Sequence, residues 1–518
     1  MGIKLRFAPP AALAVVLVTL PLTGVSFRGD ERRNIYFNAE RFGTNPLEPL
    51  SQAFSEIDVF LNQGNFRPLG RFLDYTEHVF VFEAAEASGV PPHIVQGMIR
   101  LGMLVLLALV ARRLVTRLMA SSGVDEASSY LPLALAACLV SAGTEHPIVH
   151  FPFLFITSAL IVLGVCQWVV RDQDLETQRC SCFQLIAVGL VGALTASFFD
   201  MTYVAPPLAL AYLVARAFAQ AKTPGSTART AAAKRVAALW VGFLAVFVPV
   251  RLMIAAECSD GRCYSGSDIE ISSKVFGLLA DRVITAFPVS GWRFNASQAE
   301  ATGTFFGAKD ALGNSLTALV LLGLAAVVFL AFRSRSSEVT SSKSAARPAL
   351  ALIAFGCSIT LFSGLLVSFS RLLQREQFAI GEGWRDTLLA QTGWALVICG
   401  AAVLVSQKVG QVEWRLSVTR LALLVLLASS ASLTLIANER AALTDRRDDL
   451  ASITIQISST TVNFDVSDES NAYRCHLLDR YTTFEPDPKA WIGGPQLSQT
   501  LNALTFSRYG RPYCEITG

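Results

Sequence analysis

The chain has 518 residues, of which 52% are apolar and only 16% charged, and its formal net charge is +3. Soluble globular domains carry about a quarter charged residues, so this deficit excludes an ordinary soluble protein. The net charge is small and no basic stripe with interleaved aromatic residues occurs, so we expect no nucleic-acid partner.

Apolar runs recur along the chain, many of them close to the ~20 residues that a helix needs to cross a bilayer. They lie near residues 9–27, 97–119, 129–143, 150–170, 183–199, 201–219, 236–256, 313–332, 348–369, 387–406 and 418–437. The sequence therefore predicts an all-α polytopic membrane protein with about 11 transmembrane helices.

Basic residues indicate the orientation. Lys4 and Arg6 precede the first run, alternate loops from there are rich in Lys and Arg, and the short turns near 144–149 and 200–202 contain neither. Basic loops stay in the cytoplasm, so we expect a plasma (inner) membrane protein with its N-terminus cytoplasmic and its C-terminus extracytoplasmic. The first run also fits a signal peptide cleaved near Val25. We favour a retained anchor, because the run has about 19 residues and no Ala-x-Ala site.

The ten cysteines give an independent check of this orientation. Cys258, Cys263, Cys475 and Cys514 fall in regions predicted to lie outside. An even number in an oxidising compartment indicates two bridges, most simply Cys258–Cys263 and Cys475–Cys514.

Three predicted outside regions, 28–96, 257–312 and 438–518, are too long to be turns. The first contains two helix-like pieces, at 49–62 and 69–87. Phe72, Tyr75, Val79 and Phe82 recur in the second piece at three- and four-residue spacing, which indicates an apolar face. Such a helix either lies in the membrane interface or belongs to a small domain packed over the bundle.

The last region, 438–518, follows the final apolar run. Its segment 452–466 alternates polar with β-branched residues, so we expect a small α+β extracytoplasmic region.

A carboxylate pair, Asp30 and Glu31, comes directly after the first run in FRGDERRNIYFNAERFG. Two carboxylates at the outer surface suit a general base or cation ligands. The plainer interpretation is a charged cap that ends a membrane helix.

The position of this pair resembles the GT-C superfamily of membrane glycosyltransferases, in which a carboxylate opens a long first outer loop. The string Asp30-Glu31-Arg32-Arg33 is similar to the acidic motif of the protein O-mannosyltransferase and lipid A aminoarabinose transferase branch. The resemblance implies that Asp30 or Glu31 is the catalytic base and that the donor is a polyprenyl-phosphate sugar. It also implies a GT-C-like module at 1–312 followed by variable helices at 313–437, and we expect residues 438–518 to form a separate tail domain. The segment 65–74 and the tail have no counterpart in those branches.

In such a reaction the polyprenyl phosphate is the leaving group, and cationic side chains are needed to hold its negative charge. Arginine suits this role because its guanidinium donates two parallel hydrogen bonds to phosphate. The candidate substrate-binding residues are Arg33, Arg251, Arg371, Arg375, Arg385 and the acidic Asp200 at an outer turn. The alternatives are contacts with lipid headgroups or with carboxylates such as Glu376, Glu382 and Asp386. Arg67 and Arg71 are a further pair, which a helix partner at Asp74 or Glu77 would also explain.

Glu145, His146 and His150 are weak candidate metal ligands in GTEHPIVHFP. Two prolines interrupt the helix there, so a hydrogen-bonded hairpin tip is favoured. No cofactor is firmly implied, and a divalent cation stays open.

The sequence contains no P-loop, GxSxG, Rossmann fingerprint or CxxC pair in a supporting context. We therefore expect a membrane glycosyltransferase of the cell envelope, with a lipid-linked sugar donor, a glycan, lipid or protein acceptor, and membrane lipids as partners. The alternative is a non-catalytic membrane assembly or scaffold protein. A secondary transporter fits less well, because charges cluster at the helix ends and the two halves have different loops.

Overall fold

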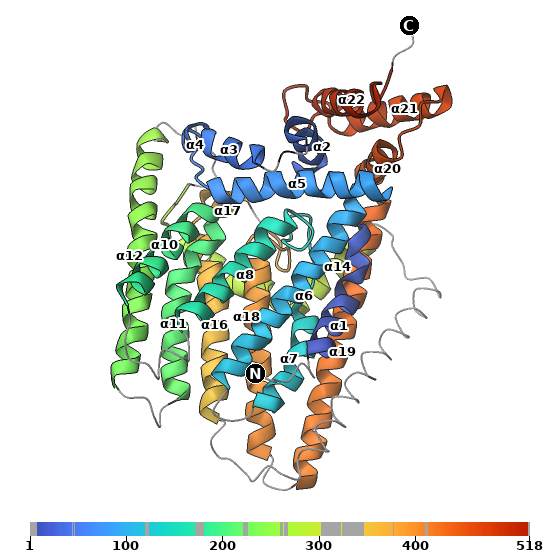
Figure 1. Ribbon diagram of the computed structural model, residues 1–518. Helices are drawn as coiled ribbons and strands as arrows, with labels where there is room; N and C mark the ends of the chain where they lie inside the picture. The colour runs from blue at the N-terminus through green and yellow to red at the C-terminus, as the bar shows by residue number, and fades with distance from the viewer. Residues whose placement is uncertain are drawn as a thin grey trace.

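The computed structural model describes residues 8–515 except 44, 46, 120–123, 171–180, 221–225, 259–262, 264–267, 302–322, 324–345, 377 and 410–412. The described residues form helices and contain no β-strand, apart from one isolated bridge between Ile269 and Ser370. Long helices stand side by side as a bundle, and shorter helices lie across one end of it (Figure 1).

Seven described helical segments are long and apolar enough to cross a membrane. They are α6 (Pro92–Leu118), α8 (Pro152–Val169), η3 (Asp200–Val204) continued by α11 (Ala205–Ala219), α12 (Ser226–Glu257), α16 (Ala346–Ser368), α18 (Thr387–Val409) and α19 (Glu413–Arg447). Three shorter apolar segments are α1 (Ala8–Thr19) with η2 (Leu20–Gly24), α7 (Val124–Cys138) and α10 (Cys182–Phe198). Ten predicted runs thus coincide with helices, and the run at 313–332 lies outside the described residues. The chain is a helical multi-pass membrane protein.

Small residues let these helices approach closely. A Cβ on Gly242 of α12 would lie 1.8 Å from the Gly189 carbonyl oxygen of α10, and one on Gly97 would lie 2.1 Å from that of Thr23. Such contacts replace the hydrophobic driving force that is absent between helices in lipid. The second contact fixes α6 against η2, directly before the Asp30–Glu31 pair.

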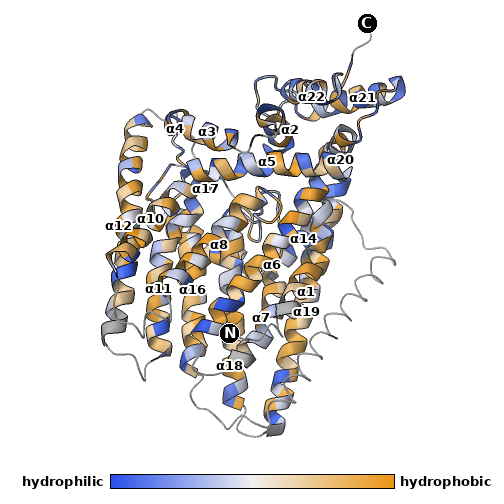
Figure 2. Ribbon diagram, in the orientation of Figure 1, coloured by the Kyte–Doolittle hydropathy of each residue, from blue (hydrophilic) through white to orange (hydrophobic). Residues whose placement is uncertain are grey.

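We call the end of the bundle that is covered by transverse helices the capped end (Figure 1). The transverse helices are α2 (Glu31–Phe42), α3 (Glu48–Ser55), α4 (Ile57–Leu61), α5 (Pro68–Ser88), α20 (Asp449–Val462), α21 (Asp468–Phe484) and α22 (Gly494–Tyr509). They carry far more hydrophilic residues than the helices beneath them (Figure 2). The predicted helical pieces at 49–62 and 69–87 are confirmed, and α2 was not expected.

The second predicted outside region also reaches the capped end. It contributes α13 (Lys274–Thr285) and α14 (Pro288–Ala301), and it packs with the short helix α17 (Arg371–Arg375). Its predicted Cys258–Cys263 disulfide is present, and the Cys263 sulfur lies 3.6 Å from the Asn62 carbonyl oxygen after α4. The second region thus contacts the first near Cys263, and the first packs on the third through α2 and α22.

The predicted α+β character of the tail is wrong, because 452–466 forms mainly the helix α20. Its buried residues, Ala451, Ile453, Thr454, Ile457, Ser458 and Thr461, recur at three- and four-residue spacing. Asp448 caps the helix by accepting from the Ala451 amide at 2.8 Å. The β-branched residues satisfy a helical face as well as a strand, and packing decided between the two.

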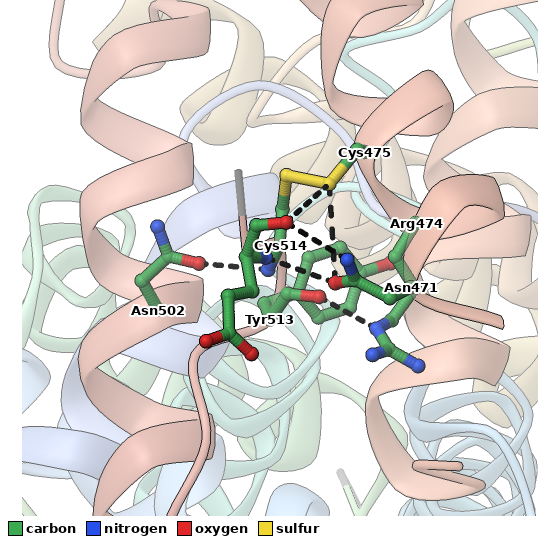
Figure 3. Close-up of a disulfide and its surroundings, with 7 residues drawn as sticks. Asn471, Arg474, Cys475, Asn502, Tyr513 and Cys514 are labelled. Carbon is green, nitrogen blue, oxygen red and sulfur yellow. Dashed lines mark hydrogen bonds between the residues drawn. A yellow bond between two sulfur atoms is a disulfide. The ribbon is translucent and has the colours of Figure 1, made fainter. Parts of the chain in front are cut away.

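The tail is fastened by the predicted Cys475–Cys514 disulfide between α21 and the end of the chain (Figure 3). Nearby, Nε of Arg474 donates to the Tyr513 carbonyl oxygen at 2.6 Å, and the Cys514 amide donates to Oδ1 of Asn502 at 3.0 Å. One hydrophobic core then joins the tail to the first region. Its buried members include Tyr36, Phe82, Ile453, Tyr481 and Leu501.

Candidate functional site

Asp30 and Glu31 lie where the chain leaves the first apolar helix and enters α2. Gly29 has a φ of +47°, which favours glycine, and a Cβ there would lie 3.0 Å from Nε2 of His150. Asp30 occupies the position before the first helical residue, its side chain makes no capping hydrogen bond, and it is exposed. Asp30 is therefore the carboxylate of the pair that solvent reaches.

Glu31, by contrast, is fully buried. Its Oε1 accepts from Nε2 of Gln96 at 2.7 Å, and its Oε2 accepts from the Phe151 amide at 3.1 Å. Burial raises the pKa of Glu31 to about 7, and His150 and the two hydrogen bonds oppose that rise. Glu31 thus holds α2 against α6 and the start of α8.

Glu77 of α5 accepts from the same Gln96 nitrogen at 2.8 Å. Its other oxygen is buried and has no hydrogen-bond partner among the described residues. Burial, and after it repulsion from Glu31, hold the pKa of Glu77 well above its ordinary value. The sequence suggested Glu77 only as a partner for an arginine, because nothing local signals a contact with Glu31.

Glu145 and His150 form a pair, with 2.9 Å between Oε2 of Glu145 and Nδ1 of His150. Burial acts to raise the pKa of Glu145, but the hydrogen bond and charge of His150, followed by Arg385 and Arg28, lower it overall. This pair lies between the Gly29–Asp30 turn and the loop that carries Arg385.

His146 does not join this pair. It is buried, its Nδ1 accepts from the Ile148 amide at 3.2 Å, and its Nε2 lies 3.3 Å from the amide nitrogen of Gln391. Burial lowers the pKa of His146 to about 3. No group of three or more His, Cys, Asp or Glu side chains able to hold a metal occurs within the described residues.

Three predicted substrate-binding residues, Asp200, Arg251 and Arg385, line one cavity of about 320 Å³, which we call the arginine cavity. Nη2 of Arg251 lies 3.8 Å from Oδ1 of Asp200, and its guanidinium lies 5.6 Å from the ring centre of Phe247. The Arg385 guanidinium lies 5.0 Å from the ring centre of Trp384. Most other lining residues are apolar: Met201, Tyr203, Phe247, Ile269, Ile271, Leu366, Val367, Phe369 and Trp384. Asp268 and Ser370 complete the lining, so two arginines and two carboxylates meet a largely apolar chamber.

The other predicted arginines do not line this cavity. Arg371 is paired with Asp268 at 3.4 Å and Glu270 at 3.7 Å, so it braces the segment that forms one cavity wall. Arg375 is exposed at the end of α17. Arg33 is buried between α2 and the tail, where its Nε donates to Oγ1 of Thr500 at 2.9 Å.

Arg67 lies near enough to the arginine cavity for the charges of Arg385 and Asp200, two of its lining residues, to act on it. Arg67 was not among the candidate substrate-binding residues predicted from the sequence. Burial lowers its pKa to about 10, repulsion from Arg71 and Arg385 adds to this, and Asp74 and Asp200 oppose it. Its guanidinium also lies 5.4 Å from the ring centre of Phe199. The sequence feature that could have indicated the position of Arg67 is Pro68, because proline is favoured in the first turn of a helix and α5 begins there.

A second cavity, of about 250 Å³, lies beside the segment that precedes the Gly29–Asp30 turn. It is lined by Arg28 and Asp445, which form an ion pair, and by polar residues such as Ser141, Thr144 and Gln298. The Ser26 amide donates to Asp445 at 2.8 Å. Asp445 was not predicted, since its partner lies more than 400 residues earlier. Neither Asp30 nor Glu31 lines either described cavity.

Comparisons with family models, with curated proteins and with solved structures found no match to this chain.

Proposed function

We propose that this chain is a GT-C-like glycosyltransferase of the plasma membrane, with eleven spans and an extracytoplasmic capped end. In this proposal it moves a sugar from a polyprenyl-phosphate donor to an acceptor at the capped end. The observation that carries the proposal is the arginine cavity, in which Arg251 and Arg385 meet a largely apolar lining.

The donor combines the two properties of this cavity. Its polyprenyl chain is apolar, and burying apolar surface contributes roughly 25 cal/mol per Å². Its phosphate is anionic, and charge-assisted hydrogen bonds from arginine are about twice as strong as neutral ones. Asp200 lies 3.8 Å from Arg251 and is placed to orient that guanidinium.

The reaction needs one proton acceptor. The bond between the sugar anomeric carbon and the phosphate oxygen breaks, and a bond from the acceptor oxygen to that carbon forms. The acceptor proton passes to Asp30, the exposed carboxylate, while the polyprenyl phosphate leaves as an anion held by the arginines.

Asp30 is linked to the arginine cavity through one chain of neighbours. His150 lies against Gly29 and pairs with Glu145, and the charge of Arg385 lowers the pKa of Glu145. The proposal requires that an acceptor bound at Asp30 reach the phosphate of a donor held at the Arg385 end of the cavity.

A second candidate is a non-catalytic membrane assembly protein. It is favoured by one observation: the carboxylate pair lines neither cavity, and Glu31 is fully used in internal hydrogen bonds. In that case the arginine cavity would bind an anionic lipid and no group transfer would follow.

The first experiment measures donor binding. The full chain in nanodiscs is titrated with undecaprenyl phosphate and with undecaprenol, which lacks the phosphate, and binding is read by native mass spectrometry. We expect undecaprenyl phosphate to bind, and the Arg251→Ala, Arg385→Ala variant to bind it at least about tenfold more weakly, since a hydrogen bond to a charged group contributes ~1.5–3 kcal/mol. Arg480→Ala, a partly exposed arginine of α21 paired with Asp449, is the matched control.

The second experiment measures transfer. A panel of undecaprenyl-phosphate hexoses and pentoses is incubated with the protein and a cell-envelope extract, and the radiolabel transferred to glycan, lipid or protein is counted. Transfer that Asp30→Asn abolishes supports the enzyme. Binding of undecaprenyl phosphate without transfer from any panel donor would favour the assembly protein, and equal binding by wild type and the double variant would refute the donor site.

A further inference from the structure

Trp491 lies in the turn between α21 and α22, and 47% of its surface is exposed. A tryptophan typically buries ~150–250 Å², so on the order of 100 Å² of this side chain stays open. Figure 1 shows α22 above α2, and α2 on the side of α5 away from the long helices. The turn that carries Trp491 therefore belongs to the helices across the capped end and not to the bundle of long helices.

Three residues of α2 hold the indole in place. The Arg33 guanidinium lies 3.7 Å from its ring centre, the Phe37 ring meets it edge-on at 5.1 Å, and its Nε1 donates to Oδ1 of Asn34 at 2.8 Å. Arg33 covers one ring face and is itself anchored on Thr500 of α22. About half of the tryptophan surface stays exposed beside these contacts, and a ring fixed in this way loses little side-chain freedom on binding.

The same helix places this ring next to Asp30. The Asn34 amide donates to the Asp30 carbonyl oxygen at 3.0 Å, so these residues stand one helical turn apart. Residues four apart share a helix face, with roughly 5–6 Å between them. Trp491, bonded to Asn34, thus lies along the face of α2 that carries the exposed carboxylate.

A fixed aromatic face beside a general base suits one class of acceptor. A sugar ring presents C–H groups on one face, which pack on an aromatic ring, and hydroxyl groups around its edge. The exposed side chains of Asp487 and Lys489, in the same turn as Trp491, are suited to bind such hydroxyl groups. A ring about as wide as one helical turn, ~5.4 Å, would bring one of its hydroxyl groups to Asp30.

We propose that Trp491 is the stacking platform for a saccharide acceptor, and that α2 aligns this platform with Asp30. The inference rests on the proposed function and narrows the acceptor from a glycan, lipid or protein to a carbohydrate. It also assigns the tail a role in acceptor binding.

The test uses the wild-type full chain in nanodiscs without any donor. Radical footprinting measures oxidation of each tryptophan and phenylalanine with and without mannotriose, galactotriose or arabinotriose. We expect at least one trisaccharide to protect Trp491 severalfold and to leave Phe506, an exposed aromatic of the same tail, unchanged. Protection of Trp491 by none of the three would overturn the proposal.

Variants then separate binding from folding. Trp491→Ala should bind the protecting trisaccharide about tenfold more weakly, as expected when an aromatic contact is lost. Trp491→Phe should recover most of the affinity, because it keeps a ring, and Phe506→Ala should bind as wild type. Equal binding by wild type and Trp491→Ala would also overturn the proposal, whatever the thermal stability of the variant.

The failure of this inference differs from the failure of the proposed function. Trisaccharide binding is measured without donor and should persist in the Arg251→Ala, Arg385→Ala variant. Retained trisaccharide binding with no transfer from any donor would refute the transferase alone. Transfer in which Trp491→Ala leaves the acceptor KM unchanged would refute the platform alone.

Discussion

Glu31 of α2 and Glu77 of α5 accept hydrogen bonds from the same amide nitrogen of Gln96, at 2.7 and 2.8 Å. Both side chains are buried, and Glu31 is among the causes that raise the pKa of Glu77. Two buried carboxylates this close do not readily ionise together, so the pair retains a proton and titrates as a unit.

The capped end should therefore lose stability as pH rises. The pKa of Glu31 is about 7 in the folded chain and 4.5 ordinarily, so between these values the folded state holds a proton that the unfolded state releases. This contribution is complete below about pH 4.5 and is lost as pH rises through 7. Thermal unfolding in nanodiscs should give a Tm at pH 8 that is lower than at pH 5 by on the order of 2–4 °C.

Glu77→Gln isolates the cause of this pH dependence. Glutamine keeps an acceptor for Gln96 and places an amide where the unpartnered oxygen lies, so it resembles the protonated acid. The variant should raise the Tm at pH 8 and reduce the pH dependence, and the part caused by burial of Glu31 should remain. Glu40→Gln, an exposed position on α2, should change neither. A pH profile of Glu77→Gln that matches wild type would refute the shared proton.

Asp30→Asn should abolish transfer and preserve the fold. The side chain is exposed and makes no capping hydrogen bond, so its charge supports chemistry more than stability. Loss of a positioned base should slow transfer by ~100- to 10,000-fold. The measurement is label transfer from the active donor, with protein level and Tm recorded alongside.

Glu31→Gln should behave differently, because both oxygens of Glu31 accept hydrogen bonds, whereas glutamine keeps one acceptor oxygen and its NH2 group cannot accept. We expect a lower Tm and less folded protein. Asp58→Asn, at an exposed position on α4, is the control for Asp30. Full transfer by Asp30→Asn would remove Asp30 from the mechanism.

Asp386→Ala should weaken donor binding although Asp386 does not line the arginine cavity. Asp386 is buried and accepts from Arg282 at 2.7 Å, which fixes the loop that carries the adjacent Arg385. Leaving Arg282 buried without its partner should cost ~3–5 kcal/mol and displace Arg385. Both Tm and undecaprenyl phosphate affinity should fall.

The double change Arg282→Met, Asp386→Leu is the matched test. It removes both charges, so it should recover much of the Tm lost by Asp386→Ala. Recovered stability together with recovered affinity would assign the pair to loop placement. An unaltered Tm in Asp386→Ala would show that this ion pair does not hold the loop.

Reporter fusions test the proposed orientation. The capped end carries both disulfides, which form in an oxidising compartment. A reporter active only outside the cytoplasm should give signal when fused after residue 518 and none at residue 340. The opposite pattern would place the capped end in the cytoplasm. It would contradict the transferase proposal, which requires this end to be extracytoplasmic.

The sequence alone was sufficient to predict a helical multi-pass membrane protein and both disulfides. Runs of about 20 apolar residues leave a helix as the main way to satisfy the backbone in lipid, so ten of the predicted runs reappear as helices. Cysteine pairing followed from the number of cysteines predicted to lie on one side. The amphipathic α5 was also visible, because Phe72, Tyr75, Val79 and Phe82 share one face.

Only the tertiary structure decided which charged residues gather. Arg251 and Arg385 are separated by more than 130 residues, and their cavity exists because α12 and the loop before α18 meet there. The structure also distinguished Asp30 from Glu31. These adjacent residues have almost the same sequence context, whereas the burial of Glu31 depends on its contacts with the distant Gln96 and Phe151. The segment 452–466 formed a helix because its β-branched residues found a buried face against the first region. Periodicity records which residues prefer burial, and the contact that buries them is a property of the whole fold.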